Sequence, residues 1–508
     1  MQLQSALQLE LRRTTLSFAL LLKGMLIIQA FTALAMYLFV VWHRLSYPFE
    51  LEWIEGGILE QVTRIVHGQP VYVPPSLEFV PFLYPPLYFY VSAGVAYILG
   101  PGFLPLRLVS FIASLVCLAT IFDIVRRETR NTFAALLAAG LFVGTFRLTG
   151  AWMDIARVDS LFLALFLVFV RVMRFSSSIS SGIAAGIIAA LAILTKQTAL
   201  VVCVPIIAAS FLTNWRRSIA LVCSTAIVFG GITWLLNATS DGWYTFYIFD
   251  LLKQQTEWIP GAATQFWLYD LLCQLPVAIS ISVIFLIDQW QTRDYKRLLF
   301  WGAVLGGGLA GAFLTRIKIG GYDNVLLPGY AVIAIVFGMG IAYLLQAATT
   351  YMQGHIRVAM LYVAFSMQFI MVMYNPFAQI PSAEDLATGQ QLVQMLAQDN
   401  TSVYMPYDGY LTTLAGRPTY AHHAATWDVM RGEEMTRGKA ILTQSLTQAV
   451  HEQKFDTIIL DITWNFLPDL DQYYVQTGEI LQDNSAFYPV TGTRTRPSLV
   501  YTRRSKIR

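Results

Sequence analysis

The sequence predicts a polytopic α-helical membrane protein with about 11 spans and a small α/β domain at its C-terminal end. Of its 508 residues, 56% are hydrophobic and only 13% are charged, whereas soluble domains carry about 25% charged residues. Apolar runs follow one another as far as residue 374. After that point charge rises, and short strand-like stretches alternate with helix-like ones.

Eleven apolar runs are candidate spans. They cover residues 24–42, 106–125, 133–149, 159–174, 182–195, 198–213, 218–236, 270–287, 298–315, 325–346 and 357–374. Several are shorter than the roughly 20 residues that a perpendicular helix needs, so their ends are approximate. No small-residue cleavage site follows the first run, which is therefore interpreted as a retained span.

A twelfth apolar run, 85–99, is interpreted as a juxtamembrane or re-entrant helix on the outer face. Short basic loops usually stay in the cytoplasm. If 85–99 does not cross, six basic clusters all fall inside: Arg12/Arg13, Arg126/Arg127/Arg130, Arg171/Arg174, Arg216/Arg217, Arg293/Lys296/Arg297 and His355/Arg357. This assignment places the N-terminus inside a cytoplasmic (inner) membrane. A first loop at 43–105, a loop at about 237–269 and everything after 375 then lie outside.

The chain thus divides into a transmembrane part, 1–374, and an extracytoplasmic α/β domain, 375–508. In the latter, 384–398 and 436–453 are helix-like, while 401–406, 455–462 and 497–502 are strand-like. The net charge of +3 is too small to indicate nucleic-acid binding. The four cysteines form no CxxC pair and lie in or beside apolar runs, which argues against disulfides and a cysteine metal site.

Charged residues gather at the predicted outer face, close to the ends of spans. The bases are Arg157, Lys196, Lys253, Arg316 and Lys318, and the acids are Glu52, Glu55, Asp154, Asp159, Asp250, Glu257 and Asp323. Acids can take a proton from a nucleophile, and Arg or Lys can hold a phosphate. Acids and bases gathered at one membrane face in this way suit a reaction on a lipid headgroup.

Each of these residues also has a simpler interpretation. Glu52 and Glu55 share one face if 52–67 is helical, but they can equally be solvated loop acids, as Glu50 is expected to be. Asp159 can serve only to complement the dipole of its helix, and Asp154 and Arg157 can simply pair. For Lys196 the alternative is snorkelling to the interface.

A phosphate site and a metal site are also possible. In TRIKIGGYDN, Arg316 and Lys318 precede a flexible Gly-Gly and can hold a phosphate or belong to an ordinary turn. A divalent ion on Glu52, Glu55 and Asp159 is left open. No histidine pair has the spacing of a metal site, and adjacent His422 and His423 would diverge in a strand.

An ordered set of motifs resembles the GT-C superfamily of membrane glycosyltransferases. The set is EGxxLxxxxRIxxGxPxY (55–72), YPPLYFYVSA (84–93), RLVS (107–110), RVDSLFLALFL (157–167) and LTKQTAL (194–200). The likeness is to the branch of protein O-mannosyltransferases and the aminoarabinose transferase of lipid A, and covers about 50–350. Each motif alone is weak, but the ordered set is fairly specific.

The resemblance implies transfer of a sugar from a polyprenyl-phosphate donor to a lipid, glycan or protein acceptor at the outer face, usually with inversion. It implies a first-loop acid as general base, with Glu55 as the first choice and Glu52 as the alternative. The family often has Asp-Glu there, and this chain has Ile54 at the Asp position. By the same resemblance Asp159 is a second active-site carboxylate and Lys196 the lysine of the Thr-Lys motif. Tyr84 stands where a donor-binding lysine is often found.

The sequence therefore favours a cell-envelope glycosyltransferase with catalytic Glu55, Glu52 and Asp159. Substrate-binding residues would be Lys196, Arg157, Arg316, Lys318, Tyr84 and Asp154. The main alternative is a transporter or flippase of lipid-linked or small polar substrates. Transporters usually carry ionisable groups near the midplane and internal repeats, neither of which is evident here. A lipid-linked polymerase or ligase of another fold, and a membrane anchor for a binding module, are further alternatives.

Overall fold

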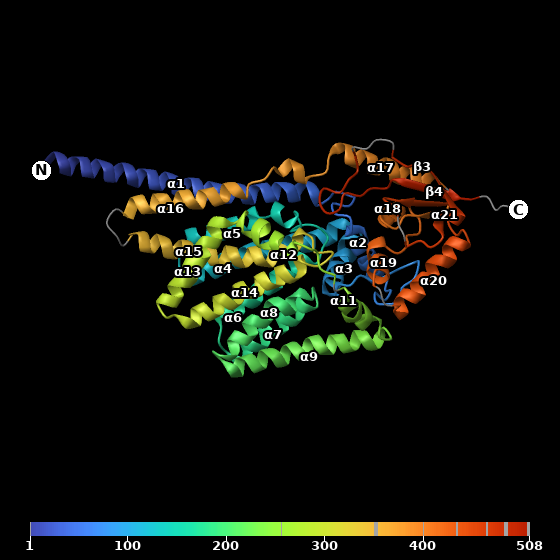
Figure 1. The fold of residues 1–508 in the computed structure, drawn as a ribbon, viewed down its shortest axis with the longest axis horizontal. Coiled ribbons are helices and arrows are strands. Elements are labelled where there is room, and N and C mark those ends of the chain that lie inside the picture. The colour runs from blue at the N-terminus through green and yellow to red at the C-terminus, as the bar shows by residue number, and fades with distance from the viewer. Residues whose placement is uncertain are drawn as a thin grey trace.

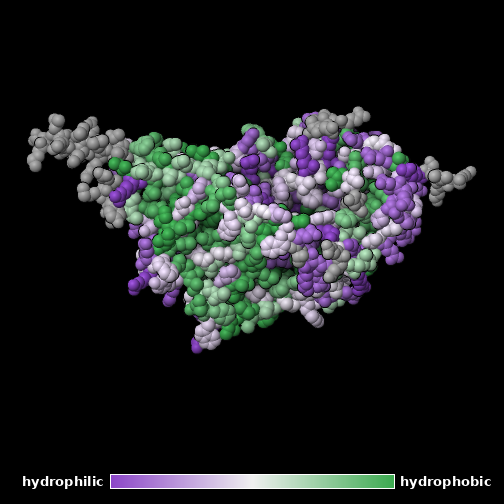
Figure 2. Space-filling model, viewed as in Figure 1, coloured by the Kyte–Doolittle hydropathy of each residue, from purple (hydrophilic) through white to green (hydrophobic). Residues whose placement is uncertain are grey.

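The protein forms a bundle of helices with an α/β region at one end (Figure 1). The computed structural model describes residues 2–255, 257–349, 354–399, 401–432, 435–463, 466–481 and 486–504. Apolar side chains cover the bundle, and polar side chains are concentrated on the α/β region (Figure 2). This contrast is typical of a protein with one part in lipid and one part in water.

Each predicted span contains a helix. The bundle comprises α1 (Gln2–Arg44), α4 (Phe103–Thr129), α5 (Thr132–Gly144), α6 (Asp159–Phe175), α7 (Ile179–Ile193), α8 (Thr198–Phe211), α9 (Trp215–Thr239), α13 (Pro276–Gln291), α14 (Tyr295–Arg316), α15 (Leu327–Thr349) and α16 (Gly354–Met371). Within the described residues, five helices are long and apolar enough to span a membrane, or seven if two bent pairs count as spans. Since α5, α7 and α8 are shorter, the structure supports several spans, and the number 11 stays a prediction.

Helix α15 lies at the centre of the bundle because it is apolar on every side. Its residues Leu327–Ile341 are buried without interruption, as expected of a helix surrounded by other helices. It packs against α4, α5, α13, α14 and α16. Gly340 permits a close approach to α13, since a Cβ there would lie 2.5 Å from Cγ2 of Ile281.

Several basic clusters predicted to share one face do meet at one end of the bundle. Arg174 and Arg297 both bind the buried carboxylate of Glu128, at 2.6 and 2.8 Å. Arg171 pairs with Asp123 on α4. Arg217 donates to the carbonyl of Met173 at the end of α6. Arg127 also pairs with Asp123. Residues of four of the six clusters therefore lie together, at the end of the bundle opposite the α/β region (Figure 1).

The first loop carries two helices that lie between the bundle and the α/β region (Figure 1). These are α2 (Glu55–Val66) and α3 (Leu87–Leu99). Helix α2 packs on α3, α4 and α18. It begins at Glu55, so the condition under which Glu52 and Glu55 share a helix face is not met: Glu52 precedes the helix and forms an isolated bridge to Thr491. The run 85–99 is helical, as predicted, and is too short at 13 residues for a perpendicular crossing.

The α/β region contains a four-stranded sheet in the order β1-β2-β4-β3. Its strands are β1 (Val403–Tyr404), β2 (Thr457–Leu460), β3 (Tyr474–Glu479) and β4 (Leu499–Arg503), and its helices are α17 (Ala383–Gln398), α18 (Gly409–Leu414), α19 (His423–Met430), α20 (Arg437–His451) and α21 (Leu470–Tyr473). Only β1 and β2 are parallel. The three predicted strands and two predicted helices are all present. Strand β3 was not predicted, because five of its six residues are exposed and carry no alternating pattern.

The loop before α13 contains only short helical turns. They are α10 (Trp243–Thr245), η2 (Phe246–Asp250), α11 (Leu251–Gln254), α12 (Ala262–Thr264) and η3 (Gln265–Leu272). Three further single turns are η1 (Arg147–Thr149), η4 (Asp323–Leu326) and η5 (Pro376–Gln379).

Candidate active site

Glu55 forms a fully buried ion pair with Arg107 of α4. Arg107 donates from Nε to Oε1 at 3.1 Å and from Nη2 to Oε2 at 2.6 Å. The carboxylate also accepts the backbone N–H groups of Leu51, at 2.7 Å, and Ala156, at 2.6 Å. Both side chains are 0% exposed. With four donors in place, the carboxylate of Glu55 is fully engaged in holding the first loop against α4.

Arg107 anchors the loop through its remaining donors as well. Its Nη1 binds the carbonyl oxygens of Arg44 and Tyr47, and its Nη2 binds that of Phe49. The guanidinium thus uses all its donors inside the protein, which a buried arginine requires. Arg107 is the first residue of the RLVS motif and was not among the site residues predicted from the sequence. An arginine near the start of an apolar helix is itself a signal of such a buried pair.

Glu52 differs from Glu55 because one of its oxygens is free. Its Oε2 accepts from Arg157 Nη1 at 2.9 Å and from the backbone N–H of Ile54 at 3.2 Å. Its Oε1 is buried and has no hydrogen-bond partner among the described residues. Burial raises the pKa of Glu52 to about 7, against the lowering effect of Arg157. A carboxylate with a free oxygen and such a pKa has the properties of a general base.

A segment from the α/β region covers Glu52. Thr491 bridges to Glu52 in a parallel arrangement, and its N–H donates to Leu51 O at 3.1 Å. The next residue, Gly492, has φ +80°, and a Cβ there would lie 3.2 Å from Glu52 Oε1. Glycine is needed here both for its left-handed backbone and for this close approach.

Arg157 connects Glu52 to Tyr84. Its Nη2 donates to the Tyr84 hydroxyl at 2.9 Å, and its guanidinium lies 4.6 Å from the ring centre of Trp152. Its Nε is buried without a partner in the part of the chain that the structure describes. The spare Nε donor of Arg157 can bind a phosphate, and the free oxygen of Glu52 beside it can accept a proton from a hydroxyl.

Asp154 pairs with Arg44 rather than with Arg157. The distance from Arg44 Nη1 to Asp154 Oδ1 is 3.0 Å, and both side chains are buried. The suggestion that Asp154 and Arg157 pair with each other was therefore wrong. Arg44 also binds the carbonyls of Gln379 and Ala151, so this pair ties the end of α1 to the loop that carries Arg157.

Asp159 and Lys196 form a second buried pair. Lys196 Nζ lies 2.6 Å from Asp159 Oδ1, and Asn324 Nδ2 donates to the same oxygen at 2.9 Å. Oδ2 has no partner among the described residues. Asp159 is the first residue of α6, but no side chain caps that helix. Lys196 is only 8% exposed, so its ammonium is directed to Asp159 and does not snorkel to water.

Arg316 lines a polar cavity of about 590 Å³ between the bundle and residues 488–494. It binds Asp270, at 2.8 Å, and Asp323, at 3.0 Å. Arg147, Arg494, Tyr322 and Tyr488 also line this cavity, together with Thr491 and Gly492. Lys318, by contrast, is half-buried, lies outside the cavity lining, and bridges through its backbone to Trp258.

The carboxylates proposed from the sequence do not form a shared ligand set. Glu55 faces Arg107, Glu52 faces Arg157 and Asp159 faces Lys196. Within the described ranges, no three His, Cys, Asp or Glu residues are placed to hold a metal ion. Glu50 is buried rather than solvated, contrary to expectation, and accepts the N–H of Gly56 at 2.6 Å.

Comparisons with known proteins found similarities in both sequence and fold. Residues 84–239 match the family model described as dolichyl-phosphate-mannose-protein mannosyltransferase. The crystal structure of ArnT from Cupriavidus metallidurans in the apo state is similar over 94% of this chain and 97% of that chain, with a TM-score of 0.59 and 13% identity. The chain therefore shares the fold of this structure over most of its length. The resemblance predicted from the motifs is thereby confirmed.

Two further GT-C structures carry ligands. ArnT from C. metallidurans bound to undecaprenyl phosphate has a TM-score of 0.57 at 13% identity, over 94% of this chain and 98% of that chain. The archaeal oligosaccharyltransferase AglB from Archaeoglobus fulgidus, in complex with an inhibitory peptide and a dolichol-phosphate, has a TM-score of 0.50 at 11% identity, over 86% of this chain and 69% of that chain. No curated protein matches the sequence significantly. The family-model match begins at residue 84 and so does not include Glu52 or Glu55. The roles of these two residues are therefore argued from their contacts in this structure.

Proposed function

We propose that this protein transfers a sugar from a polyprenyl-phosphate donor to an acceptor hydroxyl, with inversion at the anomeric carbon. The observation that carries the proposal is the buried Glu52, with one free oxygen and Arg157 on the other. The GT-C fold supports it, because ArnT binds undecaprenyl phosphate and AglB binds a dolichol-phosphate in their structures.

In this reaction Glu52 Oε1 takes the proton of the acceptor hydroxyl. The acceptor oxygen bonds to the anomeric carbon as the bond from that carbon to the phosphate oxygen breaks, and polyprenyl phosphate leaves with the electron pair. A phosphate monoester is a good leaving group, so cations rather than a strong acid are needed around it. Arg157 through its free Nε, Lys196 and Arg316 are the proposed cations, with Tyr84 fixing Arg157.

The remaining candidate residues take supporting roles in this proposal. Glu55 and Asp154 position the loops that carry Glu52 and Arg157, and Asp159 positions Lys196. The polar cavity beside Arg316 takes the donor headgroup, with Tyr322 and Tyr488 available to pack on a sugar ring. Because Gly492 lies between this cavity and Glu52, residues 490–493 must shift when the substrates bind. Lys318 lies outside the cavity lining, so its only proposed role is a long-range electrostatic attraction for the donor phosphate.

The proposed topology follows from the basic clusters. With 11 spans and residues 1–374 in a cytoplasmic membrane, the end that holds Glu128 faces the cytoplasm. The catalytic end and the α/β region, 375–508, then face outward. The donor headgroup and the lipid, glycan or protein acceptor meet there.

The proposal is tested by measuring sugar transfer with the purified protein. Radiolabelled polyprenyl-phosphate sugars are incubated with extracted membrane acceptors, and the anomeric configuration of the product is determined by NMR. Transfer with inversion is the expected result. If no donor supports transfer while the folded protein moves lipid-linked sugars across vesicle membranes, the protein is a flippase instead.

The pH profile of transfer is expected to report the ionisation of Glu52. A base must be deprotonated, so the rate at limiting acceptor rises with pH and levels off above about 7. Arg157 lowers the pKa of Glu52, so the pH at which the rate levels off should be higher in Arg157→Met. The measurement is the transfer rate from pH 5 to 9. A profile that is flat between pH 6 and 8 would exclude Glu52 as the base.

Removing the ammonium of Lys196 is expected to weaken donor binding. In Lys196→Met, the KM for the donor should rise about 10- to 100-fold, since a charged hydrogen bond contributes about 1.5–3 kcal/mol. The double variant with Asp159→Asn keeps the site free of an unpaired buried charge and should show the same KM. Lys253→Met, at an exposed lysine on the α11 turn, is the control and should bind donor normally. An unchanged KM in the double variant would remove Lys196 from the donor site.

A further inference from the structure

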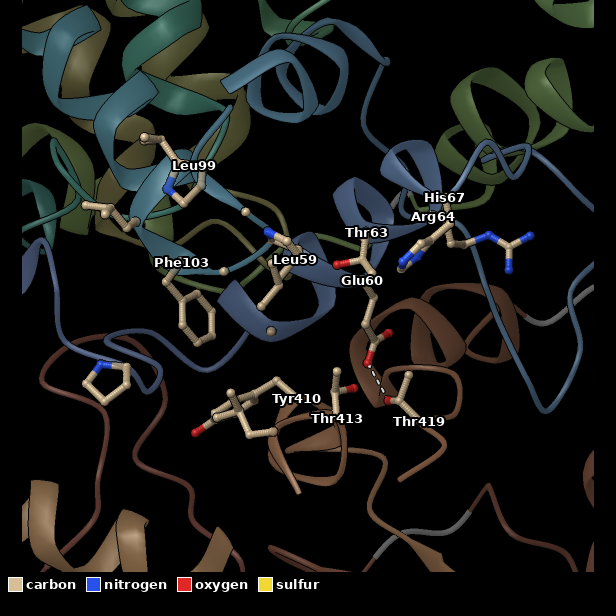
Figure 3. A pocket seen from close by; sticks show the side chains of 18 of the residues that line it. Leu59, Glu60, Thr63, Arg64, His67, Leu99, Phe103, Tyr410, Thr413 and Thr419 are labelled. Carbon is tan, nitrogen blue, oxygen red and sulfur yellow. Dashed lines mark hydrogen bonds between the residues drawn. The ribbon is translucent and has the colours of Figure 1, made fainter. Parts of the chain in front are cut away.

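A second cavity, of about 630 Å³, lies beside α2 (Figure 3). None of the residues proposed above for sugar transfer is among those that line it. Its wall is formed by helix α2, the corner between α3 and α4, helix α18 with Thr419, and first-loop residues at 46–48, 69 and 78–79. Its size is that of ordinary ligand sites, which run from about 300 to 1,000 Å³.

One wall of this cavity is apolar and continues onto a surface that is exposed and apolar. Leu59 and Phe103 point into the cavity (Figure 3). At the corner between α3 and α4, Leu99 and Leu104 line the cavity and are also 51% and 37% exposed. The adjoining Ile98 is 83% exposed. Because α4 is a candidate span that begins at Phe103, this corner lies where lipid chains meet headgroups.

The other wall carries an acid and a base that do not bind each other. Glu60 is only 8% exposed, and its carboxylate accepts one hydrogen bond, from Thr419 Oγ1 at 3.1 Å (Figure 3). Burial raises the pKa of Glu60 to about 8. Arg64, one turn further along α2, binds the carbonyl of Pro70 through Nε and Nη2, at 3.2 and 3.1 Å. Within the described chain, no cation pairs with Glu60 and no anion pairs with Arg64.

Because burial raises its pKa to about 8, Glu60 is largely protonated at neutral pH, while no cation among the described residues faces it. A ligand that brings an ammonium group would favour the ionised carboxylate and pair with it, and a phosphate on the same ligand would complement Arg64. The apolar wall and its exposed corner supply the place for an acyl chain. These three features together fit one class of molecule, in which an amine and a phosphate stand side by side on a lipid.

We propose that this cavity binds an aminophospholipid, with its ammonium on Glu60, its phosphate near Arg64 and an acyl chain leaving between Leu99 and Leu104. The bound lipid would touch both the first loop and α18 of the α/β region. It therefore joins the two parts of the molecule at the membrane surface. The proposal stands whether or not the protein transfers sugars, because its test measures lipid retention.

The test is native mass spectrometry of the full-length protein purified with dioleoyl-phosphatidylethanolamine or dioleoyl-phosphatidylglycerol. The wild type is expected to retain phosphatidylethanolamine about 10-fold more tightly than Glu60→Gln does, and phosphatidylglycerol should bind both proteins equally weakly. Leu59→Trp, which fills the apolar wall, should also lose the lipid. Glu78→Gln is the matched control, since Glu78 is an exposed acid at the same cavity that pairs with Lys454.

Two results would overturn the proposal. One is equal retention of phosphatidylethanolamine by the wild type, Glu60→Gln and Leu59→Trp. The other is retention of phosphatidylglycerol as tight as that of phosphatidylethanolamine, which would mean that the amine is not recognised. Thermal unfolding of each variant without added lipid establishes that a loss of retention is not a loss of fold.

Discussion

Replacing Glu52 by glutamine is expected to lower the rate of sugar transfer by about 10²- to 10⁴-fold, the usual contribution of a general base. The amide oxygen of glutamine can still accept from Arg157, so the local hydrogen bonds survive while the basicity is lost. The effect should appear in kcat, with little change in the KM for the donor. The measurement is steady-state transfer from a polyprenyl-phosphate sugar, with the unfolding temperature recorded for the same preparation.

Glu50→Gln is the matched control for this experiment. Glu50 lies two residues earlier, is also buried, and accepts the N–H of Gly56 with its carboxylate. Glutamine can accept the same bond, so transfer should stay within a few-fold of the wild type. Wild-type transfer by Glu52→Gln would show that another residue is the base.

Replacing Arg107 by methionine is expected to destabilise the protein by about 3–5 kcal/mol, as is usual when one partner of a buried ion pair is removed. The change leaves the Glu55 carboxylate buried without a cation and leaves three carbonyls of the first loop without their donor. The measurement is thermal unfolding in detergent, together with protease cleavage of the loop at 45–54.

Two further variants show what the Arg107 pair does. Arg127→Met removes an arginine from the same helix, where it is 51% exposed and pairs with Asp123; such surface pairs contribute about 0–1 kcal/mol. The double variant Glu55→Gln/Arg107→Met should be more stable than Arg107→Met alone. If Glu55→Gln instead abolishes transfer and leaves stability unchanged, Glu55 is the base and Glu52 is not.

The helical part of the fold could be predicted because its signal is local. Continuous apolar runs of about 20 residues have few other interpretations, and the start of α6 at Asp159 coincides with the end of a polar stretch. The pairing of basic residues with Glu128 was also foreseeable in outline, since positive charges gather on one face. Strand β3 left no such signal, because its side chains are mostly exposed.

The choice between Glu52 and Glu55 could not be made from the sequence. Both are first-loop acids three residues apart, and their difference lies in partners that are distant along the chain. Glu55 is bound by Arg107, 52 residues away, whereas Glu52 is covered by Thr491. Likewise, Asp154 finds its partner 110 residues earlier, at Arg44. Spacing along a helix carries no information about contacts of this kind.

The bridge between Glu52 and Thr491 has a consequence for the order in which the molecule is made. The two residues are separated by more than 400 positions, so the ribosome has released nearly all of the bundle before Thr491 emerges. Until then the segment around Thr491 does not yet cover Glu52, and water can reach its carboxylate. The surroundings of Glu52 are therefore completed only after the helices of the bundle have been made.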